Sequence, residues 1–321
     1  MELNLDGLLE DLLDKNKHTG FAARLKKLDH EVSVEGLDFT GRFFYLPFRL
    51  GEVTIDEFIQ YLCGKLVYFC IPRTIRDRAI AKMGTTGELE HIGKLWDEAK
   101  HLFAKASENR YRSGEPGELM LFIILEAVLF APQIVSKMYL KTSEKMPVHG
   151  SDAIHISFDE DAEILRLYWG ESKLYTTLSS AFDETCESIK SFREGKEADD
   201  RPARLRDIDI IRDHADIEDG PLKDALLKYF DPYEEESNRV EECHACFVGF
   251  NFGFLSRIAE IERDKVDDMF REEYIKRANS AASLFVEKIK SNGLDGHRFE
   301  LFLLPFADVD EFRQAFMNSL K

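Results

Sequence analysis

Two charged residues stand at the end of an otherwise apolar strand pattern, in the segment LYWGESKLY. Glu171 and Lys173 share their parity with Leu167 and Trp169, and alternate side chains on a strand point to the same face. The apolar face of this predicted strand therefore leads directly into a carboxylate and an ammonium group. Such a pair can take part in metal binding, orient an attacking water and offset negative charge on phosphorus.

The preceding segment, DAIHISFD, supplies a third group. We expect the two segments to form a hairpin that turns at Asp161 and Ala162. Its apolar pairs are then Phe158 with Leu165, Ile156 with Leu167, and Ile154 with Trp169. The next pair on the same face is Asp152 with Glu171. Cross-strand partners have Cβ atoms roughly 4.5 to 5.5 Å apart, so like charges at such a pair are destabilising.

This carboxylate pair predicts a magnesium site. Mg²⁺ binds one or two carboxylates together with water and substrate phosphate oxygens. Lys173 lies one strand repeat further on, where it is placed to polarise the attacking water or to steady the charge on phosphorus. A Glu-x-Lys pair by itself is usually just a polar strand end. The in-register Asp152 favours the site instead, because the apolar pairing locates it independently.

A further carboxylate, Glu118, lies in the first turn of a helix predicted to begin near Pro116. From Leu119 to Phe130 only Glu126 interrupts an apolar sequence that has no polar face, so this helix is predicted to be buried. The helix dipole alone favours a carboxylate in the first turn. The functional interpretation of Glu118 is a further metal or water ligand.

Two other groups of residues have weaker claims to chemistry. Lys137, Lys141 and Lys145 are spaced four apart and are predicted either to contact phosphates or, more simply, to form a solvated helix face. Cys243 and Cys246 have the spacing of half a zinc site, but no second pair accompanies them. On a strand these two thiols would point to opposite faces, so free cysteines in a core strand are the preferred interpretation.

Hydrophobic periodicity predicts the elements that must position these groups. After residue 110 we expect a buried helix over 116–140, strands over 152–159 and 163–173, a helix over 176–194, a strand at CHACFVGFNF, a long helix over 255–291, a strand at RFELFLLPF and a helix over 308–320. Before residue 110 we expect a strand ending near Phe48 and helices over 55–83, interrupted at Pro72, and 88–105. This order predicts an α/β or α+β fold.

Composition limits the classes of function. The chain has 321 residues, 44% of them apolar, which is ample for a packed core. No signal peptide is recognisable and the most apolar segment, LMLFIILEAVLFA, is too short to span a bilayer, so a cytoplasmic protein without membrane contact is expected. Five cysteines, an odd number, indicate free thiols. The net charge of −18 means that nucleic-acid binding would need a local basic patch or a basic partner.

An early Glu in a helix, then Asp, then Glu-x-Lys across a hairpin, then a helix, resembles the PD-(D/E)XK nuclease superfamily, which cleaves DNA phosphodiesters with Mg²⁺. By position, Glu118 matches the helix acid, Asp152 the motif Asp, and Glu171 and Lys173 the Glu-x-Lys. The resemblance implies a restriction-endonuclease-like core over 111–321, with helices around a mixed sheet. It also implies that Asp152, Glu171 and Glu118 hold Mg²⁺, or Mn²⁺ in its place. Residues 1–110 form an N-terminal α/β region without an assigned role.

One departure is Ser151, where the superfamily's name has Pro; many members write Gly-x-Asp, as this chain does from Gly150 to Asp152. More narrowly, RSGEPGELMLF, HGSDAIH, WGESKLY, VGFNFGF and FLLPF resemble the HamA family of nuclease subunits in bacterial Hachiman anti-phage systems. That resemblance implies a DNA nuclease that a helicase partner restrains and releases upon infection. Two alternatives remain: a non-catalytic binding subunit that keeps the nuclease fold as a scaffold, and a nuclease of DNA repair or restriction.

Overall fold

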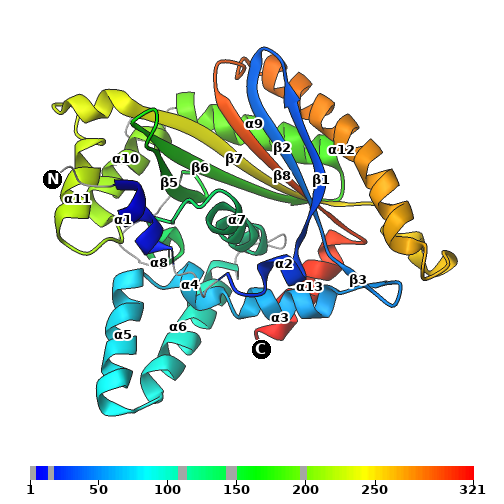
Figure 1. Ribbon diagram of the computed structural model, residues 1–321, viewed down its shortest axis with the longest axis horizontal. Helices are drawn as coiled ribbons and strands as arrows, with labels where there is room; N and C mark the ends of the chain where they lie inside the picture. Colours follow the sequence, from blue (N-terminus) through cyan, green and yellow to red (C-terminus); the bar gives the residue numbers. More distant parts are fainter. Residues whose placement is uncertain (1–4, 14–17, 108–113, 142–149, 196–200) are drawn as a thin grey trace.

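A six-stranded mixed sheet forms the centre of the computed structural model, with helices on both of its faces (Figure 1). The structure describes residues 5–13, 18–107, 114–141, 150–195 and 201–321. The sheet has the order β1-β2-β8-β7-β6-β5, in which the four inner strands are parallel and the two edge strands antiparallel. The strands are β1 (Lys26–Val34), β2 (Leu37–Tyr45), β5 (Ala153–Asp159), β6 (Ile164–Tyr175), β7 (Val240–Asn251) and β8 (Arg298–Phe306). The predicted class, helices around a mixed sheet, is confirmed.

A short hairpin, β3 (Phe48–Arg49) with β4 (Glu52–Val53), lies outside this sheet. The helices that follow the first strands are α3 (Ile55–Cys63), α4 (Leu66–Cys70), α5 (Arg73–Thr86), α6 (Glu90–Ser107), α7 (Glu115–Val128) and α8 (Lys137–Lys141). The later helices are α9 (Leu178–Glu194), α10 (Ala203–His214), α11 (Pro221–Lys228), α12 (Val266–Ser291) and α13 (Val309–Ser319). Two short helices, α1 (Leu5–Leu12) and α2 (Phe21–Arg24), precede β1.

The helices divide between the two faces because neighbouring residues of β6 point in opposite directions. Helix α7 lies on the face of Gly170, where an added Cβ atom would stand only 2.9 Å from Leu121 Cδ2. Helices α9 and α12 lie on the other face, where the rings of Trp169 and Phe192 are 5.2 Å apart between centroids (Figure 1). The odd-numbered residues of β6, Glu171 and Lys173 among them, therefore face α9.

The predicted hairpin of β5 and β6 is confirmed in its register. Ile154 pairs with Trp169, Ile156 with Leu167, and Phe158 with Leu165. The predicted helix over 116–140 is wrong in its second half, because α7 ends at Val128. Phe130 then adopts a left-handed φ of 51° and Pro132 follows, and neither residue continues an α-helix.

The N-terminal strands belong to the same sheet as the predicted nuclease region, because β2 pairs in parallel with β8. The sheet thus crosses the division at residue 110, and the division itself stays a prediction. A second link is at α5, whose N-cap residue, Pro72, provides no side-chain cap. The carboxylate of Asp216, from the loop after α10, instead accepts hydrogen bonds from the backbone N–H groups of Arg73 and Thr74.

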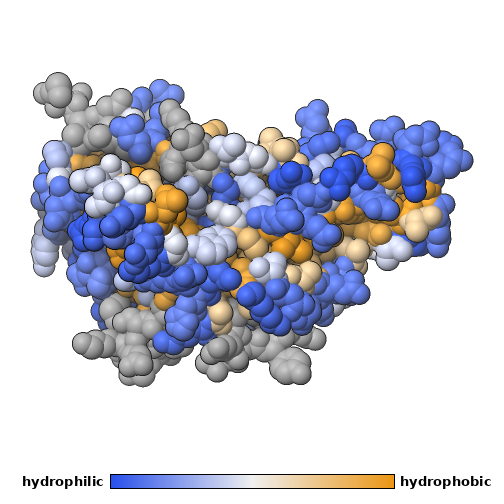
Figure 2. Space-filling view, turned by 90° about the horizontal axis from the view of Figure 1, so that it is seen from below, coloured by the Kyte–Doolittle hydropathy of each residue, from blue (hydrophilic) through white to orange (hydrophobic). Residues whose placement is uncertain are grey.

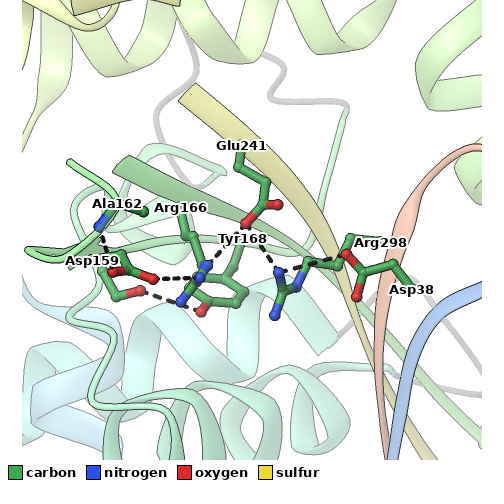
Figure 3. A network of polar contacts seen from close by, with 8 residues as sticks. Asp38, Asp159, Ala162, Arg166, Tyr168, Glu241 and Arg298 are labelled. Atoms are coloured by element: carbon green, nitrogen blue, oxygen red, sulfur yellow. Dashed lines mark hydrogen bonds and ion pairs between the residues drawn. The ribbon is translucent and has the colours of Figure 1, made fainter. Parts of the chain in front are cut away.

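A chain of ion pairs crosses five strands of the sheet (Figure 3). Arg166 of β6 lies 2.6 Å from Asp159 and 2.9 Å from Glu241. Arg298 of β8 lies 3.1 Å from Glu241 and 3.5 Å from Asp38 of β2. Each of these arginines thus stands between two carboxylates, and the chain of charges runs from the β5 edge into the N-terminal strands.

Hydrophilic residues cover most of the face seen in Figure 2, and hydrophobic residues lie between them in smaller patches. Within the described part of the chain, none of the helices combines the length and the apolar character needed to cross a membrane.

Candidate active site

Glu171 and Lys173 form an ion pair on the α9 face of β6, with Lys173 Nζ 2.6 Å from Glu171 Oε1. Their side chains are only 12% and 18% exposed. Lys173 Nζ also donates a hydrogen bond to Ser188 Oγ of α9 at 3.2 Å. Strand β6 therefore supplies both charged groups, and Ser188 of α9 holds the ammonium group of Lys173.

Asp152 lies directly before β5, at the end of the hairpin where Glu171 also lies. Its backbone N–H donates to the carbonyl of Gly170 at 2.8 Å, and the last regular pair of the ladder is Ala153 with Gly170. Its Oδ2 accepts hydrogen bonds from the backbone N–H of Ser172 at 2.8 Å and from Ser172 Oγ at 3.1 Å. The carboxylate thus replaces the backbone pairing where the ladder ends, and Ser172 fixes its orientation.

The electrostatics of Glu171 agree with the repulsion that the register predicts. Burial, followed by the negative charge of Asp152, raises the pKa of Glu171 to about 7. Lys173 opposes this increase through its charge and its hydrogen bond. Burial lowers the pKa of Lys173, but the charge and hydrogen bond of Glu171, together with the charge of Asp152, outweigh it, and the pKa is raised overall. A buried group with a strongly shifted pKa beside a specific charged partner is typical of a functional site.

Glu118 lies in the first turn of α7 and is 5% exposed. The burial predicted for the first two turns of this helix is confirmed. The turn packs directly on the residue that holds Asp152, since a Cβ atom at Gly117 would lie 3.3 Å from Ser172 Oγ. Glu118 also contributes, after burial, to a raised pKa of the Cys70 thiol in α4. Its side chain is therefore buried within electrostatic reach of Cys70, and its part in the site stays a prediction.

Comparison with known proteins decides the family. A family model described as HamA matches residues 23–320. The chain belongs to the HamA family. This membership implies a component of the Hachiman anti-phage defence system. No curated protein matches the chain.

The match to the HamA family includes the N-terminal strands as well as the hairpin. It begins shortly before β1 and ends at the last residue of the chain but one, so it spans every strand of the six-stranded sheet. The motifs that carry the resemblance in the sequence all lie after residue 110. The continuous sheet explains why one family model spans both regions.

The residues of the candidate site suit a hard divalent cation. Asp152 and Glu171 offer carboxylate oxygens, the ligands that Mg²⁺ and Mn²⁺ prefer, and a cation would offset the burial and the charge of Asp152, which raise the pKa of Glu171. Among the described residues, no three or more His, Cys, Asp or Glu side chains gather into a group that could hold a metal ion. The assignment of Asp152, Glu171 and Glu118 as metal ligands stays a prediction.

Zinc binding by the CHAC segment is not supported. Cys243 packs into the core on the α7 face of the sheet, and Cys246 packs into the core on the α9 and α12 face. All five cysteines of the chain are free. The two thiols point to opposite faces, as the strand prediction required.

One sequence-based interpretation is wrong. Lys137 is neither a phosphate contact nor part of a solvated face, because its side chain is 2% exposed and lies 2.8 Å from Asp207 Oδ2. The side chain of Lys141 and all of Lys145 lie outside the described residues. Sequence reasoning also missed Ser172 and Ser188, which hold Asp152 and Lys173. For Ser172 the position inside the Glu-x-Lys triplet was a usable signal; for Ser188 there was none.

Proposed function

We propose that this chain is a metal-dependent DNA nuclease, the effector of an anti-phage defence system, and that Asp152, Glu171 and Lys173 form its reaction centre. The observation that carries this proposal is the coupling of the three groups at one end of the hairpin. Glu171 has a pKa raised to about 7 beside Asp152, and it forms a 2.6 Å ion pair with Lys173. Such an arrangement opposes folding at neutral pH, so a functional reason for it is favoured over a structural one.

Asp152 and Glu171 would hold Mg²⁺ or Mn²⁺, with Glu118 as a candidate further ligand that acts directly or through water. When bound, the ion polarises a phosphate oxygen and lowers the pKa of bound water. Lys173 favours the ionised form of Glu171 and donates its remaining N–H group to a water or a phosphate oxygen. Ser172 keeps Asp152 oriented through its backbone N–H and its hydroxyl group.

The proposed substrate is DNA and the proposed partner is the helicase of the same defence system. Membership of the HamA family supports both, and the net charge of −18 supports a partner that contributes most of the positive surface. The helicase would restrain the nuclease in the absence of infection and deliver DNA to it afterwards.

A plasmid-cleavage assay tests the proposal, with and without Mg²⁺, on the chain alone and with its helicase partner. We expect Mg²⁺-dependent cleavage, and a decrease of about 100-fold or more in Glu171→Ala and in Lys173→Ala. Glu171→Ala removes a metal ligand, whereas Lys173→Ala leaves the ligands in place. The two variants are therefore expected to differ in Mn²⁺ affinity although both are inactive.

A matched control is Lys223→Ala, which removes a lysine from an exposed ion pair with Asp219, 2.8 Å long. This variant is expected to cleave like the parent. If Glu171→Ala cleaves DNA like the parent, the nuclease assignment is wrong. If it is inactive only because it melts far below the parent, Glu171 is structural and the non-catalytic scaffold is the better description.

A further inference from the structure

A buried ion pair contacts Ser151, the residue that precedes Asp152. Lys137 of α8 and Asp207 of α10 have side chains that are 2% and 0% exposed. Lys137 Nζ lies 2.8 Å from Asp207 Oδ2 and 3.0 Å from Oδ1. A buried pair of this kind adds little net stability compared with apolar residues of the same volume, because both charges lose their hydration. Its contacts with the neighbouring backbone show what the pair does here.

The ion pair holds Ser151 at every polar group of that residue. Asp207 Oδ2 accepts hydrogen bonds from the Ser151 backbone N–H at 3.0 Å and from Ser151 Oγ at 2.7 Å. Lys137 Nζ donates to the carbonyl oxygen of Ser151 and lies 3.3 Å from its Oγ. We call Lys137, Ser151 and Asp207 the Ser151 clamp. Apolar residues in place of Lys137 and Asp207 would leave the backbone groups of Ser151 buried without partners.

Gly150 shows how closely the clamp approaches the backbone. Its φ of +144° is one that residues with a side chain rarely adopt. A Cβ atom at this position would lie 2.6 Å from Asp207 Oδ1 and 2.8 Å from Oδ2. Asp207 cannot yield easily, since Lys137 and Ser151 both bind its carboxylate. The backbone of residues 150 and 151 is therefore fixed by side chains from α8 and α10.

We propose that Lys137 and Asp207 are positioning residues for the carboxylate of Asp152. The clamp fixes the peptide before Asp152, the β5–β6 hairpin fixes the peptide after it, and Ser172 holds one carboxylate oxygen. The orientation of the metal-binding group is thus determined before any metal arrives. This role rests on the proposed nuclease function and extends it to α8 and α10, which contribute no ligand of their own.

The test is Mn²⁺ binding to the metal-free protein, measured by isothermal titration calorimetry beside a thermal melt. The main variant is the double substitution Lys137→Met with Asp207→Leu, which removes both buried charges together and so avoids an unpaired one. We expect its Mn²⁺ affinity to fall by about 10- to 100-fold while the melt stays cooperative. A residue with a purely structural role would lower the melting temperature without this loss of affinity.

Two further variants make the result decisive. Asp209→Asn is the matched control. Asp209 lies on the same helix as Asp207, but its side chain is 32% exposed and forms an ion pair with Arg201 at 2.9 Å. The Mn²⁺ affinity of this variant should equal that of the parent. Ser151→Ala removes a single hydroxyl group from the clamp and leaves the ion pair intact. It should weaken Mn²⁺ binding by about threefold or more, and it decides the question if the double variant does not fold.

The two proposals fail in different ways. If Glu171→Ala loses Mn²⁺ binding while the folded clamp variants stay within about twofold of the parent, the positioning role is wrong and the metal site stands. If the parent binds no Mn²⁺, or Glu171→Ala binds it as the parent does, the metal site is wrong and the positioning role falls with it.

Discussion

The surroundings of Glu171 in the folded protein oppose the ionisation of its carboxyl group. Its carboxylate is 12% exposed and shares one end of the hairpin with Asp152. Lys173 lowers the pKa of Glu171, but burial and the charge of Asp152 still raise it to about 7 from 4.5. Above that pKa the metal-free protein contains a buried charge that its surroundings disfavour, and the free energy of unfolding is lower as a result.

The first prediction is the pH dependence of this effect. Below pH 4.5 Glu171 is protonated in both the folded and the unfolded chain, so Glu171→Gln should not change stability there. Between pH 4.5 and 7 the folded state binds more protons than the unfolded state, so the parent loses stability as the pH rises. Above pH 7 the metal-free Glu171→Gln variant should therefore be more stable than the parent, by about 1 to 3 kcal/mol.

Urea unfolding of both proteins in a metal chelator, from pH 5 to pH 8, measures this difference. Glu287→Gln is the control, since Glu287 is exposed on α12, and its difference from the parent should not change over this range. Added Mn²⁺ should stabilise the parent at pH 8 more than at pH 5, because protons compete with the metal for the carboxylate. A constant difference between Glu171→Gln and the parent across the pH range would contradict the assignment of the raised pKa.

At the level of single residues, the sequence allowed part of this site to be predicted. Asp152 and Glu171 were found because three apolar pairs locate them without reference to their chemistry. The role of Ser151, where the superfamily's name has Pro, could not be predicted because its partner Asp207 is 56 residues away in the sequence. Lys137 was misread for the same reason, since its partner lies 70 residues away. Long-range polar pairs leave no periodic signal.

At the level of elements, periodicity was most reliable where one face of an element is buried. Strands β5 and β6 have strict alternation, and their register followed from it. The segment 255–291 was predicted as one helix, but a 3-10 helix over Leu255–Glu260 precedes α12, which begins at Val266. Strand β1 was missed because it lies at the sheet edge and only Leu28 among its residues is buried. Its inward residues alternate with exposed ones, but Val32 and Val34 are only partly buried and His30 interrupts the apolar series, so the signal in the sequence is weak.

The docking of α7 on β6 gives a prediction at this scale. A Cβ atom at Gly170 would lie 2.7 Å from Ala153 Cβ and 2.9 Å from Leu121 Cδ2, closer than real contacts allow. Gly170→Ala should therefore lower the free energy of unfolding by about 1 to 3 kcal/mol, since the helix or the neighbouring strand must shift. Urea unfolding measures this change.

Gly93 is the matched control for Gly170. It lies in α6 with no atom within 4 Å of an added Cβ atom, so Gly93→Ala should raise the free energy of unfolding by about 0.5 to 1 kcal/mol through helix propensity. If Gly170→Ala and Gly93→Ala change the free energy of unfolding in the same direction, the close packing of α7 on β6 does not depend on the absence of a Cβ atom at Gly170.

At the level of the whole molecule, one sheet joins the N-terminal strands to the candidate site. Two arginines of this sheet are paired with carboxylates on neighbouring strands. Arg166 and Arg298 each lie between two carboxylates (Figure 3). The whole chain carries 43 Lys and Arg against 61 Asp and Glu. Arginines engaged in this way add little to the attraction of a phosphate backbone, which depends on cations that can replace condensed counterions.

The last prediction follows from this charge balance. The logarithm of a DNA-binding constant falls with the logarithm of salt concentration by roughly 0.9 for each phosphate that the protein neutralises. We expect the chain alone to bind duplex DNA weakly, with a slope equivalent to about three phosphates or fewer, and the complex with the proposed helicase partner to show a clearly steeper slope and higher affinity. Fluorescence anisotropy in a metal chelator measures both without cleavage. A steep slope for the chain alone would mean that it has a basic DNA-binding surface of its own, and the helicase would then be needed for regulation only.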